Sequence, residues 1–210
     1  MADVKGRPTL RDERAQVTRC RIAEAARTLF SSRGYGATTL QAVADEAGVA
    51  VQTVYAVYGS KAGILHALRD SVLHQPEADA LFEQALREGK AEAKLKLFAH
   101  SIRRRWEFGH DVVEILRDAG AADAAVRAEV EQVLDRRRAG IDRLAKTLEG
   151  QLAPEIDVAY ASAVIDALTL PEVYTELTDV AHWDADDFEA WLARSLRNQL
   201  LASTRGPSPA

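Results

Sequence analysis

The sequence is poor in the residues that cross-link a chain or carry it across a membrane. Its 210 residues include a single cysteine, Cys20, so no disulfide can form within the chain. No apolar run approaches the roughly 20 residues that span a bilayer, and the polar start MADVKGRPTLRDERAQ has no signal-peptide core. We therefore expect a soluble, cytoplasmic protein with no membrane partner.

The common motifs of catalysis and metal binding are missing as well. The sequence contains no GxxxxGK[ST], GxGxxG, GxSxG or HExxH pattern. Its five histidines show no close metal-ligand spacing. We predict that the protein is not an enzyme and that it has no cofactor and no metal site.

Helical patterns fill most of the chain, while β-branched alternation is nearly absent, so the sequence predicts an all-α protein. Hydrophobic residues make up 47% of it, enough to bury a sizeable core. We expect an N-terminal domain over residues 1–60, a helical body over 61–202 and a disordered tail over 203–210. The predicted helices cover residues 10–32, 39–47, 50–57, 60–76, 77–88, 91–108, 110–119, 123–148, 155–181 (with Pro171 inside) and 184–202.

The stretch TTLQAVADEAGVAVQTVYAVYGSK, residues 38–61, has the pattern of two short helices joined by a tight turn. Gly48 follows Ala47 where the turn needs a left-handed backbone, and the small Ala44 permits a close helix crossing. The second helix then directs Gln52, Thr53 and Tyr55 outward, with the length and chemistry to reach base edges and phosphates. The apolar pattern alone would equally suit any small helical hairpin.

Charge is distributed unevenly along the chain. Residues 1–61 carry nine Lys or Arg and six Asp or Glu, a net charge of +3, whereas the whole chain has −5 and the remainder therefore −8. Within the first residues, Lys5 and Arg7 form a basic arm that could follow a phosphate backbone or enter a minor groove. A basic N-terminal part on an otherwise acidic chain is typical of a DNA-binding domain, although a basic surface that is only solvated remains the alternative.

The segment GYGATTLQAVADEAGVAVQTVYAVYGSKAGIL is preceded by a basic amphipathic helix whose end, LFSSRGY, overlaps its first two residues. It resembles the DNA-binding domain of the tetracycline-repressor (TetR) family of bacterial transcription regulators. The stretch ALTLPEVYTELTDVAHWDADDFEAWLARSL is similar to the last two helices of many members. The resemblance implies a TetR-like fold: an N-terminal three-helix helix-turn-helix domain and a C-terminal helical domain for ligand binding and dimerisation.

The resemblance also implies roles for individual residues. The sequence differs from the family pattern at Val57, where many members have a histidine, and at Gln52, where many have glycine; Gln52 adds a side chain able to read adenine. Lys61 would hold a phosphate, and the remaining DNA contacts would come from Thr39, Gln41, Val51, Gln52, Thr53 and Tyr55.

Two apolar stripes near the C-terminus suit either a dimer interface or the core of a single protomer. The family's habit of dimerising through its last two long helices favours the interface. The residues concerned are Val158, Ala161, Ile165 and Leu168 in one helix and Phe188, Trp191, Leu192 and Leu196 in the other.

A pocket for a hydrophobic or aromatic effector is expected in the body, although the same side chains could simply form core. Its predicted lining is Phe98, Ile102 and Trp106 at helical spacing, with His66, His110 and Tyr174 as polar points.

These features together predict a homodimeric, sequence-specific repressor that binds an inverted-repeat operator on double-stranded DNA and is released by a small molecule. Two alternatives remain open: a helical small-molecule-binding protein or enzyme with an incidental helix-turn-helix, and a non-specific, nucleoid-type DNA binder.

Overall fold

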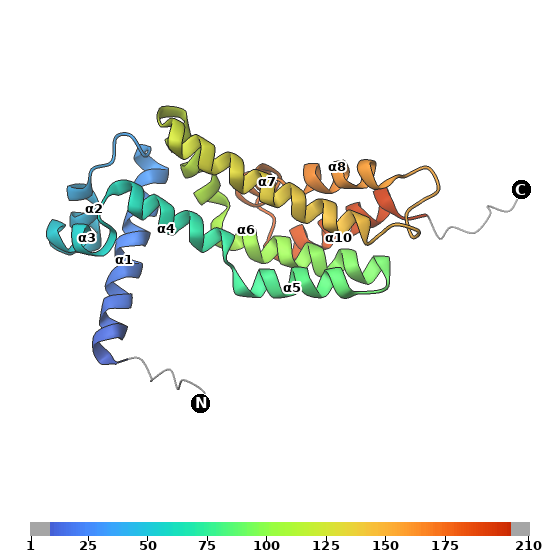
Figure 1. Ribbon diagram of the computed structural model, residues 1–210, viewed down its shortest axis with the longest axis horizontal. Helices are drawn as coiled ribbons and strands as arrows, with labels where there is room; N and C mark the ends of the chain where they lie inside the picture. The colour runs from blue at the N-terminus through green and yellow to red at the C-terminus, as the bar shows by residue number, and fades with distance from the viewer. Residues whose placement is uncertain (1–8, 203–210) are drawn as a thin grey trace, which may run out of the picture. The chain divides into compact units, whose positions relative to one another are not determined.

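The computed structural model describes residues 9–202, a range that contains helices and no strand, as the sequence predicted (Figure 1). The predicted basic arm with Lys5 and Arg7, and the predicted disordered tail, lie outside this range. The chain forms two compact units. We call them the head unit (residues up to 71, with 114–127) and the body unit (72–113, with residues from 128 onward).

The head unit is built on three helices, α1 (Leu10–Arg33), α2 (Leu40–Ala47) and α3 (Val51–Tyr58). It also contains most of α4 (Lys61–Leu73), the last turns of α6 (Ala91–Ala122) and the start of α7 (Ala124–Lys146). Its core is formed by apolar side chains with less than 4% exposure, among them Ile22, Leu29, Phe30, Val43 and Val54.

Local chemistry sets the ends of these helices. Thr9 and Asp12 form a capping box at the start of α1, and the backbone and hydroxyl of Thr9 lower the pKa of the Asp12 carboxyl by hydrogen bonding to it. Gly34 ends α1 with a φ of 82°. At the start of α4, the Ser60 hydroxyl accepts a hydrogen bond from Gly63 N–H at 3.0 Å.

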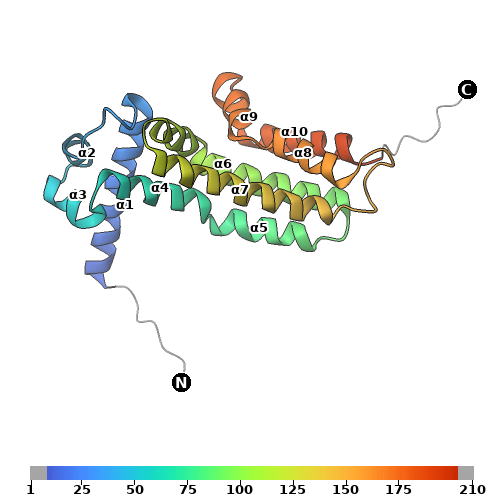
Figure 2. The ribbon, with the colours of Figure 1, turned by 45° about the horizontal axis from the view of Figure 1, so that its top comes forward.

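The body unit contains α5 (Pro76–Arg87), α8 (Val158–Leu168), α9 (Pro171–Thr175), the π-helix η1 (Glu176–Val180) and α10 (Ala185–Leu200), together with the larger parts of α6 and α7. Ion pairs join neighbouring helices: Arg105 of α6 to Asp79 of α5, and Arg143 of α7 to Glu83 of α5. Figure 2 shows α8 and α10 next to each other, as their packing contacts require.

One predicted boundary agrees with the structure and one predicted helix does not. Gly109 has a non-helical backbone, φ −156°, ψ 23°, where the sequence predicted a helix end, and the helical segments on its two sides form the kinked α6. A Cβ at Gly109 would lie 2.3 Å from Val72 Cγ2, so glycine permits a close approach there. The predicted helix 155–181 is instead divided: Asp157 caps α8, Thr169 ends it, and Pro171 starts α9.

The apolar stripes of α8 and α10 face the interior of the protomer. Ala161, Ile165, Phe188, Leu192 and Leu196 each have 0% exposure within the single chain. Side chains with no exposed area cannot contact a second protomer, so these five residues belong to the core. The pattern could not separate the two readings, since a core stripe and an interface stripe have the same helical spacing. The other three predicted interface residues, Val158, Leu168 and Trp191, are partly exposed.

Within the described residues, no helix combines the length and apolar character required to cross a membrane.

Replacing Gly63 by alanine is predicted to destabilise the fold. Its new Cβ would lie 2.0 Å from the carbonyl oxygen of Tyr58, a backbone atom that cannot rotate away. We expect the free energy of unfolding to fall by about 1–3 kcal/mol, measured by urea denaturation. Gly89→Ala is the control, because its Cβ would meet no atom within 4 Å. Equal stability of the two variants would contradict the prediction.

Candidate nucleic-acid interface

The turn between α2 and α3 has the geometry that the sequence predicted. Gly48 is left-handed at φ 63°, ψ 42°, and the backbone closes a Schellman pair: Val49 N–H donates to Ala44 O at 3.0 Å and Gly48 N–H to Asp45 O at 3.1 Å. The small Ala44 is fully buried at the crossing of the two helices. The two short helices are therefore held as a helix-turn-helix.

Helix α3 is anchored on one side and open on the other. Val54 is completely buried, whereas Gln52 is exposed and Tyr55 is 54% exposed. Val51 and Thr53 are partly exposed. The structure thus places all four predicted contact residues of α3 on the helix, with Gln52 and Tyr55 the most accessible to a ligand.

The start of α2 presents a second group of predicted contact residues. Thr39 caps the helix, its hydroxyl accepting from Ala42 N–H at 3.1 Å, and its side chain is exposed. Gln41 is also exposed, and its amide donates to Asp45 Oδ1 at 2.8 Å within the same helix. A helix N-terminus offers free N–H groups and a positive dipole end, which together favour phosphate.

The far end of α3 is attached to α1 by an aromatic residue. The Tyr58 hydroxyl donates to Arg19 O at 2.9 Å, and the Arg19 guanidinium lies 5.2 Å from the ring centroid. Partial burial raises the pKa of the Tyr58 phenol. Tyr58 therefore fixes α3 against α1.

Lys61, the predicted phosphate ligand, bonds to the protein's own backbone. Its Nζ donates to the carbonyl oxygens of Tyr35 at 2.7 Å, Thr38 at 3.0 Å and Gly36 at 3.3 Å. The ammonium also lies 4.3 Å from the centroid of the Tyr35 ring. Burial lowers the pKa of Lys61.

Two further residues shape this surface and were not predicted. Arg21 of α1 donates from Nη2 to Ala47 O at 2.5 Å, which satisfies a carbonyl at the end of α2. Asp118 of α6 accepts a hydrogen bond from Tyr35 N–H at 2.7 Å. The contact of Arg21 could have been predicted, since basic residues often bond to the carbonyl groups at a helix end. No sequence pattern connects Asp118 with Tyr35, 83 positions away.

The predicted effector residues separate into two groups. His66 belongs to the head unit, whereas the other five belong to the body unit. There, the His110 ring lies 5.1 Å from the Tyr174 ring and its Nδ1 is 2.8 Å from Trp106 O, while the Trp106 indole donates to Thr169 O at 3.1 Å. Phe98 and Ile102 are buried along the same helix, α6.

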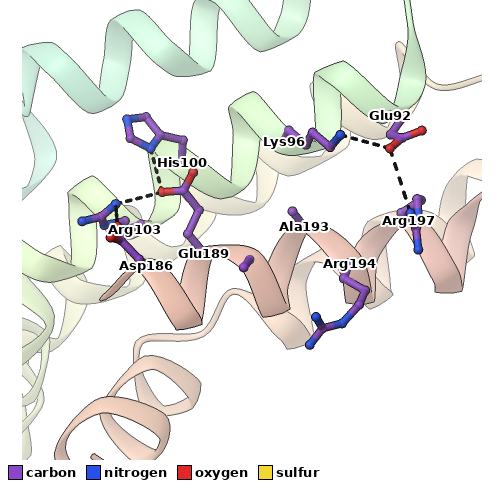
Figure 3. Close-up of a pocket in the computed structure, with 10 residues that line it drawn as sticks. Glu92, Lys96, His100, Arg103, Asp186, Glu189, Ala193, Arg194 and Arg197 are labelled. Carbon is purple, nitrogen blue, oxygen red and sulfur yellow. Dashed lines mark hydrogen bonds and ion pairs between the residues drawn. The ribbon is translucent and has the colours of Figure 1, made fainter. Parts of the chain in front are cut away.

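A charged groove of about 530 Å³ lies elsewhere in the body unit, between α6 and α10 (Figure 3). Glu189 is its central acid: Oε2 lies 2.7 Å from His100 Nδ1 and 3.2 Å from Arg103 Nη1. Arg103 also pairs with Asp186 at 2.5 Å, and Lys96 pairs with Glu92 at 3.1 Å. The Lys96–Glu92 pair lies within α6, whereas the pairs of His100 and Arg103 with Glu189 and Asp186 bind α10 to α6.

Within the described residues, no group of three or more His, Cys, Asp or Glu side chains is arranged to hold a metal ion. The prominent functional feature is instead the exposed face of a braced helix-turn-helix. That geometry defines the protein's class: a DNA-binding protein of the helix-turn-helix type.

Comparison with known proteins agrees with this class. Residues 22–68 match the family described as bacterial regulatory proteins, tetR family. The chain is 30% identical over 199 residues to the probable HTH-type transcriptional regulator ArpR of Pseudomonas putida and, to the same extent, to the HTH-type transcriptional regulator TtgR of the same species. Each alignment covers 81% of this chain and 90% of the relative. The solved structure of a SmeT–triclosan complex is similar in fold, with a TM-score of 0.66 and 17% identity, covering 93% of this chain and 100% of that one.

The chain therefore belongs to the TetR family of bacterial transcriptional regulators. The predicted TetR-like, all-α fold is confirmed, and so is the prediction of a DNA-binding regulator rather than an enzyme.

Alkaline pH should destabilise the wild type through Tyr174. Burial, with help from the carboxylates of Glu107 and Asp179, raises the pKa of this phenol from 10.0 to about 12. The folded state therefore holds the proton more tightly, and the stability that this gives is complete below pH 10 and lost as the pH rises through about 12.

Tyr174→Phe, which cannot ionise, should make the free energy of unfolding fall less steeply over this pH interval. Urea denaturation at closely spaced pH values measures the slope, with the half-exposed Tyr160→Phe as the control. Identical slopes for wild type and Tyr174→Phe would contradict the assignment.

Proposed function

We propose that the protein is a homodimeric repressor that binds an inverted-repeat operator in the bacterial cytoplasm and is released by a small hydrophobic or aromatic molecule. The observation that carries the proposal is the exposed face of α3, where Gln52 and Tyr55 project from a helix whose opposite side is anchored by the fully buried Val54. A rigid helix with free polar side chains is what major-groove recognition requires.

The proposed DNA contacts are of two kinds, contacts to base edges and contacts to the DNA backbone. Gln52 has a carboxamide that can bond bidentately to adenine N6 and N7, so it determines base preference. Thr39, Gln41, Thr53 and Tyr55 position the helices through phosphate and sugar contacts, which act on every sequence. The apolar Val51 can contact a thymine methyl, which is specific to that base. Lys5 and Arg7 add a basic arm to this footprint.

Dimerisation is proposed through the outer faces of α8 and α10, since their inner stripes are core. The exposed side of α8 is small and apolar, with Ala159, Ala163 and Ala167 beside the half-exposed Tyr160. Trp191 of α10 is partly exposed and packs edge-on against Trp183 at 6.2 Å. Small residues allow two helices to approach closely, and a two-fold dimer presents two α3 helices to two half-sites about 34 Å or a multiple apart.

The effector is proposed to bind in the body unit beside Trp106, His110 and Tyr174, with Phe98 and Ile102 contributing apolar surface. These side chains combine aromatic area with a few polar atoms, the composition of a small-molecule site. The fold relative SmeT was solved in a complex with triclosan, which is aromatic. An effector that prefers the DNA-incompetent state 100-fold would oppose DNA binding by about 2.7 kcal/mol.

The experiment that tests the proposal is selection of random duplex DNA by the purified protein at about 150 mM salt, with the stoichiometry of the complex measured on the enriched sequence. We expect an inverted repeat bound by one or two dimers. Uniform, weak retention of all sequences would instead support a non-specific DNA binder. The enriched sequence, called the selected duplex below, then serves to find effectors by release.

Substitutions on α3 should separate base reading from general affinity. Gln52→Ala should mainly relax preference at one base pair, with a loss of about 1–3 kcal/mol in discrimination, whereas Tyr55→Ala should weaken binding to all sequences alike. Binding titrations against the selected duplex and its single-base variants measure both effects. A uniform loss in Gln52→Ala, with discrimination retained, would remove its base-reading role.

A further inference from the structure

The loop that joins α1 to α2, residues 34–39, is held by two side chains from distant parts of the sequence. Lys61, the first residue of α4, donates to three of its carbonyl oxygens, and Asp118 of α6 accepts from the N–H of Tyr35. All of these residues belong to the head unit. We call this set of four hydrogen bonds the loop clamp.

The clamp occupies all three protons of the Lys61 ammonium. An ammonium group has three protons to donate, and three carbonyl oxygens of the loop lie within 3.3 Å of Nζ. In this arrangement no proton remains for a phosphate oxygen. Lys61 therefore acts on the backbone of the loop, and a direct phosphate contact would require it to leave that position.

The loop leads straight into the predicted DNA surface. Thr38, with 2% exposure, ties the loop to the end of α1, its hydroxyl lying 3.2 Å from Leu29 O and 2.9 Å from Gly34 O. The next residue, Thr39, is the exposed N-cap of α2. Because the loop is bonded on both sides, the free N–H groups at the start of α2 are held in place relative to α1 and α4.

We propose that Lys61 and Asp118 are positioning residues for DNA binding: they hold the α1–α2 loop so that the N-terminus of α2 meets the DNA backbone. The inference rests on the proposed function. It differs from the family-based role of Lys61, because neither residue needs to touch DNA.

Asp118 gives the sharper test, because electrostatics and positioning predict opposite signs. Removing a carboxylate from the head unit should strengthen attraction to a polyanion if charge alone matters. If Asp118 positions the loop, Asp118→Ala should weaken binding to the selected duplex about tenfold, as expected for a lost hydrogen bond to a charged group. Asp118→Asn should retain near-wild-type affinity, because its amide oxygen can accept from Tyr35 N–H.

Glu114→Ala is the matched control. Glu114 is exposed on the same helix one turn earlier, so its removal changes the charge equally and should leave affinity unchanged or slightly higher. Equal affinities of Asp118→Ala and Glu114→Ala, with the wild type binding normally, would overturn the inference. Failure of the wild type to bind any selected duplex would instead overturn the proposed function.

Lys61→Met separates the two roles of the lysine by salt dependence. Loss of a phosphate contact makes the slope of log K against log salt shallower by about 0.9 per contact, whereas loss of a positioning residue weakens binding and leaves the slope unchanged. We expect about tenfold weaker binding with the wild-type slope. A shallower slope would show that Lys61 contacts phosphate and would remove it from the clamp.

If Asp118→Ala does not fold, hydrogen exchange of the Tyr35 amide in the wild type and in Asp118→Asn still tests the inference. With the clamp in place, the Tyr35 amide should exchange slowly in the wild type and in Asp118→Asn, in the absence of DNA. Rapid exchange of this amide in the folded wild type would show that Asp118 does not hold the loop.

Discussion

The left-handed backbone at Gly48 is the constraint on which the proposed DNA-binding surface depends. At φ 63° any side chain would be strained, and a Cβ here would also lie 2.9 Å from Arg21 Nη2. The turn lets Val43 and Val54 bury completely in one small core while α3 keeps its outer side exposed. A helix only two turns long is therefore held in place by the turn and the core rather than by its own length.

Longer-range contacts place this helix pair within the head unit. Tyr58 connects the end of α3 to Arg19, Arg21 satisfies the end of α2, and Lys61 with Asp118 holds the loop before α2. Each contact joins a side chain to a backbone atom, so each fixes the position of the chain directly. The head unit thus combines a buried apolar core with these specific hydrogen bonds, while the polar side chains on the outer side of α3 stay exposed.

Features that depend on neighbouring residues could be predicted from the sequence, whereas features that depend on residues far away in the chain could not. Thr39, Gly48 and Ser60 act on neighbours within four residues, so the positions of the two short helices and of the turn between them could be predicted from the sequence. The close packing at Gly109 could not be predicted, because its partner, Val72, lies 37 residues earlier in the chain.

The same limit applied to the candidate sites. The stripe containing Leu192 and Leu196 has one spacing whether it packs inward or against another protomer, and only tertiary structure shows that it packs inward. The exposure of Gln52 and Tyr55 followed from helical periodicity, while their contact with DNA stays a prediction.

Photocrosslinking from position 52 tests the central claim most directly. A benzoylphenylalanine placed at Gln52 should crosslink to the selected duplex on irradiation, because α3 lies in the major groove in the proposed complex. The same group at Gln84, an exposed residue of α5 in the body unit, should give no crosslink. Crosslinking from position 84 but not from position 52 would contradict the account and place the DNA on another surface.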